Sequence, residues 1–423
     1  MRMANTATPL SSDSILKALD QIRPVIRRTP LEFHARLSQQ YDASIYLKRE
    51  DLQVVRSYKL RGAYNLMSSL TAHQRERGVV CASAGNHAQG VAYSCRQLEM
   101  RGYIYMPQNT PRQKVERVRS LGGSWISIEL VGETFDDTSY YAADYSLSRE
   151  ITFVHPFDDA RIVAGQGTVA IEVKEQLGDT ASPDFIIVPI GGGGLISGMA
   201  VYCADYLPTT QLIGAEPARA ACMMAALNAG RPVTLPQIDT FVDGAAVRTA
   251  GRIPFEICNK YIREIIPVAE GSICTEMIRL YQSEGIISEP AGALSVAALN
   301  QLANTIRGKT VVCILSGGNN DISRYPEIIE RSLIDQGLKH YFLIEFSQRP
   351  GALRRYLDEA LGPDDDITVF EYIKKSNREY GPALVGIELS RRDDYGPLLE
   401  RMTGIGLRYE IIDRESSLFR FVL

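Results

Sequence analysis

A regular alternation of short apolar strands and helical patterns runs from about residue 44 to residue 330 of the chain. The stretch at 184–190 shows it well, because it is almost wholly apolar and rich in β-branched residues, which indicates a strand covered on both faces. Further strand and helix pairs are predicted at 78–82 with 87–98, at 101–106 with 111–121, and at 124–130 with 133–147. Such alternation is typical of parallel α/β architecture.

Four consecutive glycines, Gly191, Gly192, Gly193 and Gly194, follow the stretch at 184–190, and a helix is predicted directly after them at 195–204. A turn without side chains at a helix start gathers backbone N–H groups and the positive helix end, so an anion such as phosphate fits there. A tight turn that binds nothing is the alternative, but four glycines cost much chain entropy. We therefore favour a phosphate site.

The sequence also bears on which phosphate this turn would bind. No Lys-Ser or Lys-Thr pair ends the glycine run, which argues against a nucleoside-triphosphate loop. The spacing of a dinucleotide fingerprint fails, because its third glycine position holds Ile196 or Ser197. Glu216 nevertheless ends the following strand near the place of a ribose-binding acid, so a dinucleotide stays as the second alternative.

A lysine stands at the start of another predicted helix. Residues 42–51 contain a predicted strand in which Ile45 and Leu47 alternate. Ser57 is expected to cap the following helix, with Lys59 in its first turn. A cation is disfavoured at the positive end of a helix, which lowers the pKa of Lys59 toward the neutral amine that imine formation requires. The chain has 46 lysines and arginines, so position alone also fits a solvated lysine. Taken with the glycine turn, Lys59 indicates a bound phosphorylated aldehyde.

Composition limits the setting of the chain. Its 423 residues exceed a typical single core, which predicts a large domain plus a smaller one. A net charge of −4 gives no basic footprint for nucleic acid or an anionic membrane. The seven cysteines include no close pair and fit a reducing cytoplasm rather than a disulfide framework or a zinc site. Residues 1–12 lack an apolar signal core, and no run approaches the roughly 18 apolar residues of a membrane span.

The pattern changes after about residue 335. Strands are predicted at 341–346, 367–373, 383–389 and 407–412, with one helix that opens at 349–353 and another at 395–402. The order βαββαβ is that of a ferredoxin-like α+β unit. We therefore predict a catalytic domain at 1–335, with a smaller lobe inserted at about 55–155, and a second domain at 336–423. With R-P-G-A-L at 349–353 after its first strand, this tail resembles a single ACT-like regulatory domain. A docking or dimerisation module without a ligand is the alternative.

Five motifs resemble those of the threonine dehydratase family and stand in the expected order through nearly the whole chain. They are K-R-E-D-L-Q at 48–53, S-Y-K-L-R-G-A-Y-N at 57–65, A-S-A-G-N-H-A-Q-G at 82–90, the glycines at 191–194, and S-G-G-N at 316–319. That family belongs to the fold type II pyridoxal-phosphate enzymes. The resemblance implies a two-lobed α/β catalytic domain similar to the tryptophan synthase β subunit, with pyridoxal 5'-phosphate between the lobes.

The resemblance also implies roles for single residues. Lys59 matches the lysine that forms an imine with the cofactor and then removes the substrate's α-proton. The other expected cofactor contacts are Gly191 to Gly194 with Leu195 at the phosphate, Asn86 at the ring hydroxyl, Tyr58 beside the ring, and Ser316 at the pyridine nitrogen. The substrate carboxylate is expected against Ser83, Gly85, Asn86 and His87.

Ser316 agrees with elimination chemistry. An aspartate at the ring nitrogen would keep that nitrogen protonated and make the ring a strong electron sink, whereas a serine hydroxyl holds the ring without doing so. β-Elimination needs only brief charge development, so the weaker sink suits dehydration. A helix cap after the predicted strand at 310–315 is the alternative role for this serine.

The implied reaction is the conversion of L-threonine to 2-oxobutanoate and ammonia, the first step of isoleucine biosynthesis. In this family an ACT-like tail marks the biosynthetic form, which isoleucine inhibits and valine often relieves, and which forms homotetramers. A catabolic serine/threonine dehydratase lacks such a tail, and serine racemase has a serine where this chain has Ala84. The racemase metal site places Asp six residues after Glu, and here Glu216 is followed by Cys222, so no metal is expected.

Two alternatives from other classes remain, a dinucleotide oxidoreductase and an amino-acid sensor without catalysis. One methyl group is worth only about 1–3 kcal/mol in discrimination, so serine is expected as a second substrate. The stretch at 289–293 approaches the cofactor ring in one interpretation and is a helix-start turn in the other. The scattered residues His34, His73, His155 and His340 are expected to be structural or exposed.

Overall fold

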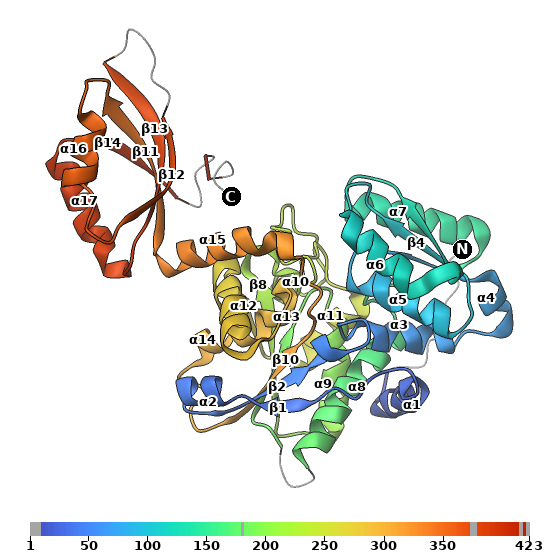
Figure 1. Cartoon of the computed structure of the whole chain (residues 1–423). Coiled ribbons are helices and arrows are strands. Elements are labelled where there is room, and N and C mark those ends of the chain that lie inside the picture. The colour runs from blue at the N-terminus through green and yellow to red at the C-terminus, as the bar shows by residue number, and fades with distance from the viewer. Residues whose placement is uncertain (1–9, 179–181, 373–378, 414–417, 420–423) are drawn as a thin grey trace. The chain divides into compact units, whose positions relative to one another are not determined.

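The computed structural model describes residues 10–178, 182–372, 379–413 and 418–419. The chain divides into two compact units, the first ending at Asn320 and the second beginning at Asp321. Our limits at 1–335 and 336–423 remain a proposal. The expectations for residues 1–9 and for Ile373, the end of a predicted strand, lie outside the described residues. Figure 1 shows two sheets in the first unit and one in the second.

The larger sheet of the first unit has six strands in the order β1-β2-β10-β7-β8-β9. All neighbours run parallel except β1, which pairs antiparallel with β2. β7 is fully buried, as its apolar sequence predicts. The strands are β1 (Leu31–Phe33), β2 (Ser44–Arg49), β7 (Phe185–Pro189), β8 (Gln211–Pro217), β9 (Glu264–Val268) and β10 (Thr310–Leu315).

The smaller sheet has four parallel strands in the order β5-β4-β3-β6. Its strands are β3 (Val79–Ala82), β4 (Gly102–Met106), β5 (Ile126–Leu130) and β6 (Thr152–Phe153). The crossover helices are α5 (Asn86–Gln97), α6 (Arg112–Gly122) and α7 (Phe135–Arg149). The alternating pattern at 78–147 therefore forms a parallel sheet, as the sequence predicts.

The remaining helices of the first unit surround the two sheets. The long apolar helices α8 and α9 pack against the larger sheet, where Val169, Ile186 and Met199 share one core. These helices are α1 (Ser12–Ile22), α2 (Ala35–Tyr41), α3 (Lys59–Ser68), α4 (Ala72–Arg77), α8 (Ala160–Leu177), α9 (Gly194–Tyr206), α10 (Cys222–Ala229), α11 (Arg252–Tyr261), α12 (Glu270–Glu284), α13 (Pro290–Ala297) and α14 (Leu299–Leu302).

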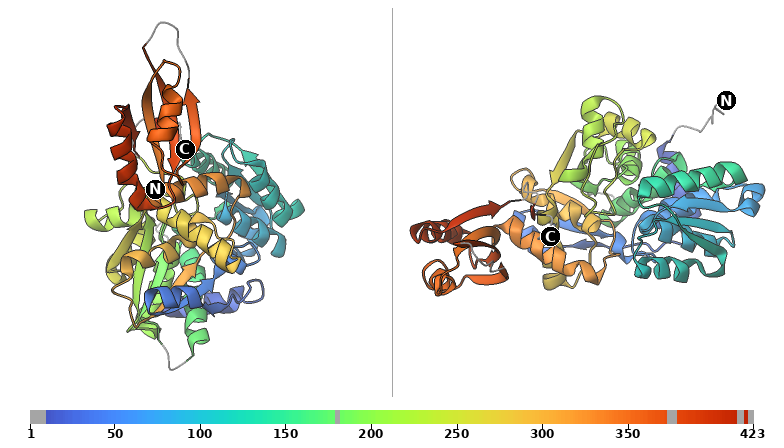
Figure 2. Two further views of the ribbon diagram at one scale, coloured as in Figure 1. Left: turned by 60° about the vertical axis from the view of Figure 1, so that its left-hand side comes forward. Right: turned by 90° about the horizontal axis from the view of Figure 1, so that it is seen from above.

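The second unit is a ferredoxin-like domain, which confirms the predicted element order. After α15 (Tyr325–Gln336) come β11 (Lys339–Ser347), α16 (Ala352–Glu359), β12 (Asp366–Tyr372), β13 (Tyr380–Glu388), α17 (Tyr395–Gly404) and β14 (Arg408–Ile412). The antiparallel sheet has the order β12-β13-β11-β14. Figure 2 shows α16 and α17 on one face of this sheet, where Tyr356 and Met402 pack against Phe342.

Three features of the described residues concern membranes, disulfides and metals. None of their helices combines the length and the apolarity that a membrane crossing requires. All seven cysteines are buried and free, as the absence of close pairs predicts. Across the described parts of the chain, no three acidic, histidine or cysteine side chains gather in a metal-binding arrangement.

Candidate active site

Lys59 is the first residue of α3, as the sequence predicts. The predicted cap is wrong, because Tyr58 occupies the cap position and contributes no side-chain hydrogen bond. Ser57 instead forms an isolated antiparallel bridge with Gly317, and its buried hydroxyl has no hydrogen-bond partner among the described residues. The backbone of Tyr58 donates to the carbonyl of Ser316 at 3.2 Å. Backbone pairing with the segment after β10 therefore replaces a side-chain cap and fixes the start of the lysine helix.

The side chain of Lys59 lies in an environment that favours the neutral amine. Its Nζ donates to the carbonyl of Pro156 at 3.2 Å. Burial lowers the pKa of Lys59 to about 8, although the carboxylate of Glu289 acts in the opposite direction. The direction agrees with the prediction, but burial is the main cause. At neutral pH a useful fraction of this lysine is therefore an unprotonated nucleophile.

The glycine turn has the shape of an anion cradle. Gly193 has φ of 92°, a left-handed conformation that favours glycine, and α9 begins at Gly194 without a side-chain cap. The first N–H groups of a helix have no acceptor within that helix, so they are available to an anion. A Cβ atom at Gly192 would lie only 2.3 Å from the Phe157 ring. Side chains are therefore excluded where the backbone would approach a phosphate.

Ser316 lies beside the start of α3, the helix that begins with Lys59. It is buried directly after β10, and its Oγ donates to the carbonyl of Ala291 at 3.1 Å. The alternative role as a helix cap is wrong, because the next helical turn is Ile322–Arg324 and Asp321 caps it. The hydroxyl thus remains a polar group at the carboxyl end of a parallel strand, where open α/β sheets place their ligands.

The segment after β3 brings together the four residues expected at the substrate carboxylate. α5 begins at Asn86, and the Gly85 N–H donates to Ser83 Oγ at 3.2 Å. The Nε2 of His87 lies 2.8 Å from the carbonyl of Val154, so Nε2 carries the proton and Nδ1 does not. Burial and the nearby Lys59 lower the pKa of His87 to about 3, which keeps the ring neutral.

The sequence analysis missed one part of the site and left another part between two interpretations. The loop after β6 supplies the Pro156 carbonyl to Lys59 and sets the Phe157 ring against the glycine turn. In the same loop, His155 Nδ1 accepts the backbone N–H of Asp158 at 2.8 Å, so this histidine is structural, as expected. The other part is Glu289, whose Oε1 lies 2.6 Å from Asn86 Nδ2. The position of this loop after a parallel strand was the only available signal for it.

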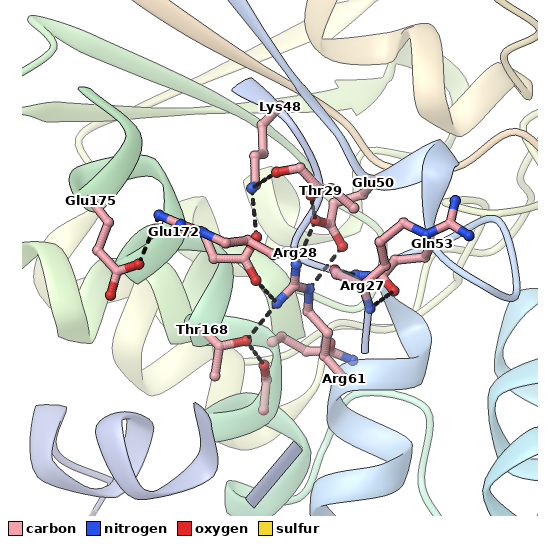
Figure 3. Close-up of polar contacts among 12 residues, drawn as sticks. Arg27, Arg28, Thr29, Lys48, Glu50, Gln53, Arg61, Thr168, Glu172 and Glu175 are labelled. Atoms are coloured by element: carbon pink, nitrogen blue, oxygen red, sulfur yellow. Dashed lines mark hydrogen bonds and ion pairs between the residues drawn. The ribbon is translucent and has the colours of Figure 1, made fainter. Parts of the chain in front are cut away.

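A buried ionic network lies beneath the lysine helix. Arg61 donates to both oxygens of Glu50 at 2.7 and 2.8 Å and to Glu172 at 2.7 Å. Lys48 donates to the other oxygen of Glu172 at 2.6 Å and to the Thr29 carbonyl at 2.6 Å. Figure 3 shows that Lys48 and Arg61 meet Glu172 from two sides. The network links β2, α3 and α8, and it holds the helix that begins with Lys59.

The comparisons with known proteins agree with this geometry. Residues 22–317 match the family described as pyridoxal-phosphate dependent enzyme, and residues 330–422 match the C-terminal regulatory domain of threonine dehydratase. A biosynthetic L-threonine dehydratase of Halalkalibacterium halodurans is 50% identical over 411 residues, which are 97% of this chain and 99% of that protein. The chain belongs to the threonine dehydratase family.

Two solved structures show the shared architecture. The processed form of threonine deaminase isoform 2 from Solanum lycopersicum is 37% identical, with a TM-score of 0.71 over 76% of this chain and 89% of that one. Maize serine racemase is 29% identical, with a TM-score of 0.70 over 77% of this chain and 98% of the racemase. Together with the matched family models, these structures confirm the predicted α/β fold, its fold type II class and the regulatory tail.

As a member of this family, the chain is a pyridoxal-phosphate-dependent enzyme. Its residues fit that group in three independent ways. The amine of Lys59 has a lowered pKa. The glycine turn keeps side chains away from the start of α9, which has no side-chain cap. The buried Ser316 hydroxyl follows β10, at the same edge of the larger sheet as the glycine turn after β7. An aldehyde, a phosphate and a ring nitrogen each have a matching partner.

Proposed function

We propose that this enzyme deaminates L-threonine to 2-oxobutanoate and ammonia in the site around Lys59, as the first step of isoleucine biosynthesis. The observation that carries the proposal is the lysine itself, which opens α3 with a pKa lowered to about 8 and faces the loop after β6. When bound, pyridoxal phosphate supplies the electron withdrawal that acidifies the substrate's α-carbon. The neutral Nζ of Lys59 then accepts the α-proton, and the β-hydroxyl takes up a proton and leaves as water. The released enamine tautomerises and hydrolyses to 2-oxobutanoate and ammonia.

The remaining residues bind and orient. Gly191 to Gly194 with Leu195 would direct backbone N–H groups to the phosphate. Asn86 and Ser316 would hold the ring hydroxyl and the ring nitrogen, and Tyr58 would lie beside the ring. The N–H groups at the start of α5, with Ser83, Gly85 and His87, hold the substrate carboxylate. The neutral His87 adds no positive charge near Lys59, which keeps the lysine a base.

The decisive experiment combines spectroscopy with turnover. The purified enzyme should show a visible absorbance band that borohydride reduction removes, and it should form 2-oxobutanoate from threonine and pyruvate from serine. A dinucleotide oxidoreductase or a sensor without catalysis would lack both the band and the turnover. Racemisation of serine without net ammonia release would identify a racemase and contradict the proposal.

We also propose that isoleucine inhibits the enzyme through the second unit, with valine as the counter-effector. An open hollow of about 580 Å³ lies at the turn between β11 and α16. Phe346, Phe370 and Tyr372 form its apolar wall, and Arg349 lines it beside the N-terminal end of α16. An apolar amino acid needs such a wall for its side chain and such a cation for its carboxylate. A homotetramer and a cytoplasmic location are retained as proposals from the family.

Removing the tail should separate catalysis from regulation. Deletion of residues 336–423 is expected to leave threonine deamination intact and to abolish inhibition by isoleucine, because the catalytic residues all lie in the first unit. In the full chain, Phe370→Ala should weaken isoleucine inhibition about tenfold or more, since it removes much of the apolar wall. Initial rates against isoleucine concentration measure both. Inhibition that persists in the truncated enzyme would contradict this assignment.

A further inference from the structure

Glu289 is a buried carboxyl group to which the proposed reaction assigns no role. It precedes α13, yet its side chain makes no capping hydrogen bond to that helix. The helix-start interpretation therefore accounts for Pro290 but not for the carboxyl group. Burial, and after it Asp243, raises the pKa of Glu289 to about 7 against the effect of Asn86. A buried acid that does not serve its own helix calls for another explanation.

The carboxyl group ends a chain of hydrogen bonds whose direction is fixed. Asn319 Nδ2 donates to the Val55 backbone carbonyl at 2.8 Å and to Asn86 Oδ1 at 2.7 Å. Asn86 Nδ2 then donates to Glu289 Oε1 at 2.6 Å. A backbone carbonyl only accepts, so Asn319 must present its NH₂ group and Asn86 must meet it with oxygen. The nitrogen of Asn86 consequently faces the carboxylate, and the amide has a single flip state.

Space around the carboxyl group is kept free by the backbone. A Cβ atom on Gly317 would lie 2.3 Å from Glu289 Oε1, and one on Gly244 would lie 3.4 Å from it. The Glu289 carboxyl group therefore needs a residue without a side chain at position 317. This position directly follows Ser316, the proposed partner of the ring nitrogen. The hydrogen bond also joins α13, which packs on the larger sheet, to α5 of the smaller sheet's lobe.

We propose that Glu289 is a positioning residue that holds the NH₂ end of the Asn86 amide, in the flip state set by Asn319, so that the second N–H of Asn86 points at the ring oxygen of the bound cofactor. The inference rests on the proposed function, which assigns Asn86 to that oxygen. One N–H of the amide is bound to Glu289 and its oxygen to Asn319, which leaves one donor in a defined direction. Without an acceptor at position 289, the amide loses the contact that holds this donor in place.

Four variants of the full chain test the proposal. Glu289→Met removes the acceptor and keeps the length of the side chain, whereas Glu289→Gln keeps an acceptor oxygen. Asn86→Ala and the double variant Asn86→Ala/Glu289→Met complete a double-mutant cycle. The readouts are the affinity of the cofactor-free protein for pyridoxal phosphate, the visible absorbance maximum of the loaded enzyme, and kcat and KM for threonine.

We expect Glu289→Met to weaken cofactor binding about tenfold, to shift the absorbance maximum and to lower kcat more than it raises KM. Glu289→Gln should bind within about threefold of the wild type, because its amide oxygen still accepts from Asn86. In the Asn86→Ala background, Glu289→Met should change binding by less than about twofold, since its effect passes through Asn86. Should the Met variant not fold, Glu289→Ala gives the same comparison.

Two results would overturn the proposal. One is a tenfold loss that persists in the Asn86→Ala background, and the other is an unchanged absorbance maximum in Glu289→Met. Glu276→Gln is the matched control, because Glu276 is also buried with a raised pKa but is bound to Arg279 on α12. Its absorbance maximum should match the wild type. A wild-type enzyme that does not turn over threonine would contradict the proposed function. That result is independent of the double-mutant cycle, which measures cofactor binding.

Discussion

Replacement of Lys59 by alanine is expected to lower kcat/KM for threonine by roughly four orders of magnitude. General acid–base catalysis alone contributes about 10²–10⁴, and this lysine is also the proposed covalent attachment point. His87 is a poor substitute base, because its pKa is lowered to about 3 and its Nε2 is bound to the Val154 carbonyl. Formation of 2-oxobutanoate measures the loss of the base, and the borohydride-sensitive band measures the loss of the covalent attachment point.

The matched control is Lys260→Ala, since Lys260 is an exposed lysine in the last turn of α11. This variant should keep wild-type turnover and the visible band. Turnover of threonine by Lys59→Ala at more than about one-tenth of the wild-type rate would remove Lys59 from the mechanism.

The lowered pKa of Lys59 makes a second measurement possible. Only the neutral amine attacks an aldehyde, so the rate at which the cofactor-free protein captures pyridoxal phosphate should rise with pH. The pKa is about 8 rather than the usual 10.5, so the midpoint of this rise should lie near pH 8. A midpoint above pH 10 would mean that burial does not act on the amine in the cofactor-free protein.

The sequence predicts best those features that depend on residues close together along the chain. The parallel sheets, the lysine in a first helical turn and the glycine turn depend on local periodicity and on the rule that ligands lie beyond the carboxyl ends of strands. Each of these predictions is confirmed by α3, β7 and α9. The order of the tail elements likewise predicted the ferredoxin-like unit.

The errors and omissions have a common physical origin. Ser57 looked like a helix cap, but its backbone pairs with Gly317, which is 260 positions away along the chain. The stretch at 289–293 allowed two interpretations, and nothing near Glu289 in the sequence indicated that its carboxyl group binds Asn86 in the other lobe. Contacts of this kind leave no local pattern, because neither partner is distinguished by its own neighbours. The roles of single site residues therefore remain proposals that rest on geometry and resemblance.

Arg61→Met should destabilise the folded enzyme by about 3–5 kcal/mol, because it leaves a buried network with an uncompensated charge. Burial alone would lower the pKa of Arg61, but Glu50 and Glu172 raise it overall, so the guanidinium is charged throughout the accessible pH range. Its loss leaves two buried carboxylates opposite the single ammonium of Lys48 (Figure 3). Urea unfolding followed by far-ultraviolet circular dichroism measures the effect. Arg252→Met breaks an exposed pair with Glu256 and should change stability by less than about 1 kcal/mol.

Charge balance and pH give this prediction two sharper consequences. The double variant Arg61→Met/Glu50→Leu leaves Lys48 paired with Glu172, so it should be more stable than Arg61→Met alone, whereas lost packing would make it less stable.

The pH dependence of stability gives a further test. Burial would raise the pKa of Glu172, but Arg61 and Lys48 lower it overall in the wild type. The ionised Glu172 therefore stabilises the wild type above its unfolded pKa, and this contribution fades as the pH falls through the folded value. In Arg61→Met one buried carboxylate lacks a counter-charge, and its protonation in acid should remove part of the cost of burying it. The stability gap between the two proteins should therefore narrow on acidification, and a gap that widens would show that the guanidinium acts through packing rather than through its charge.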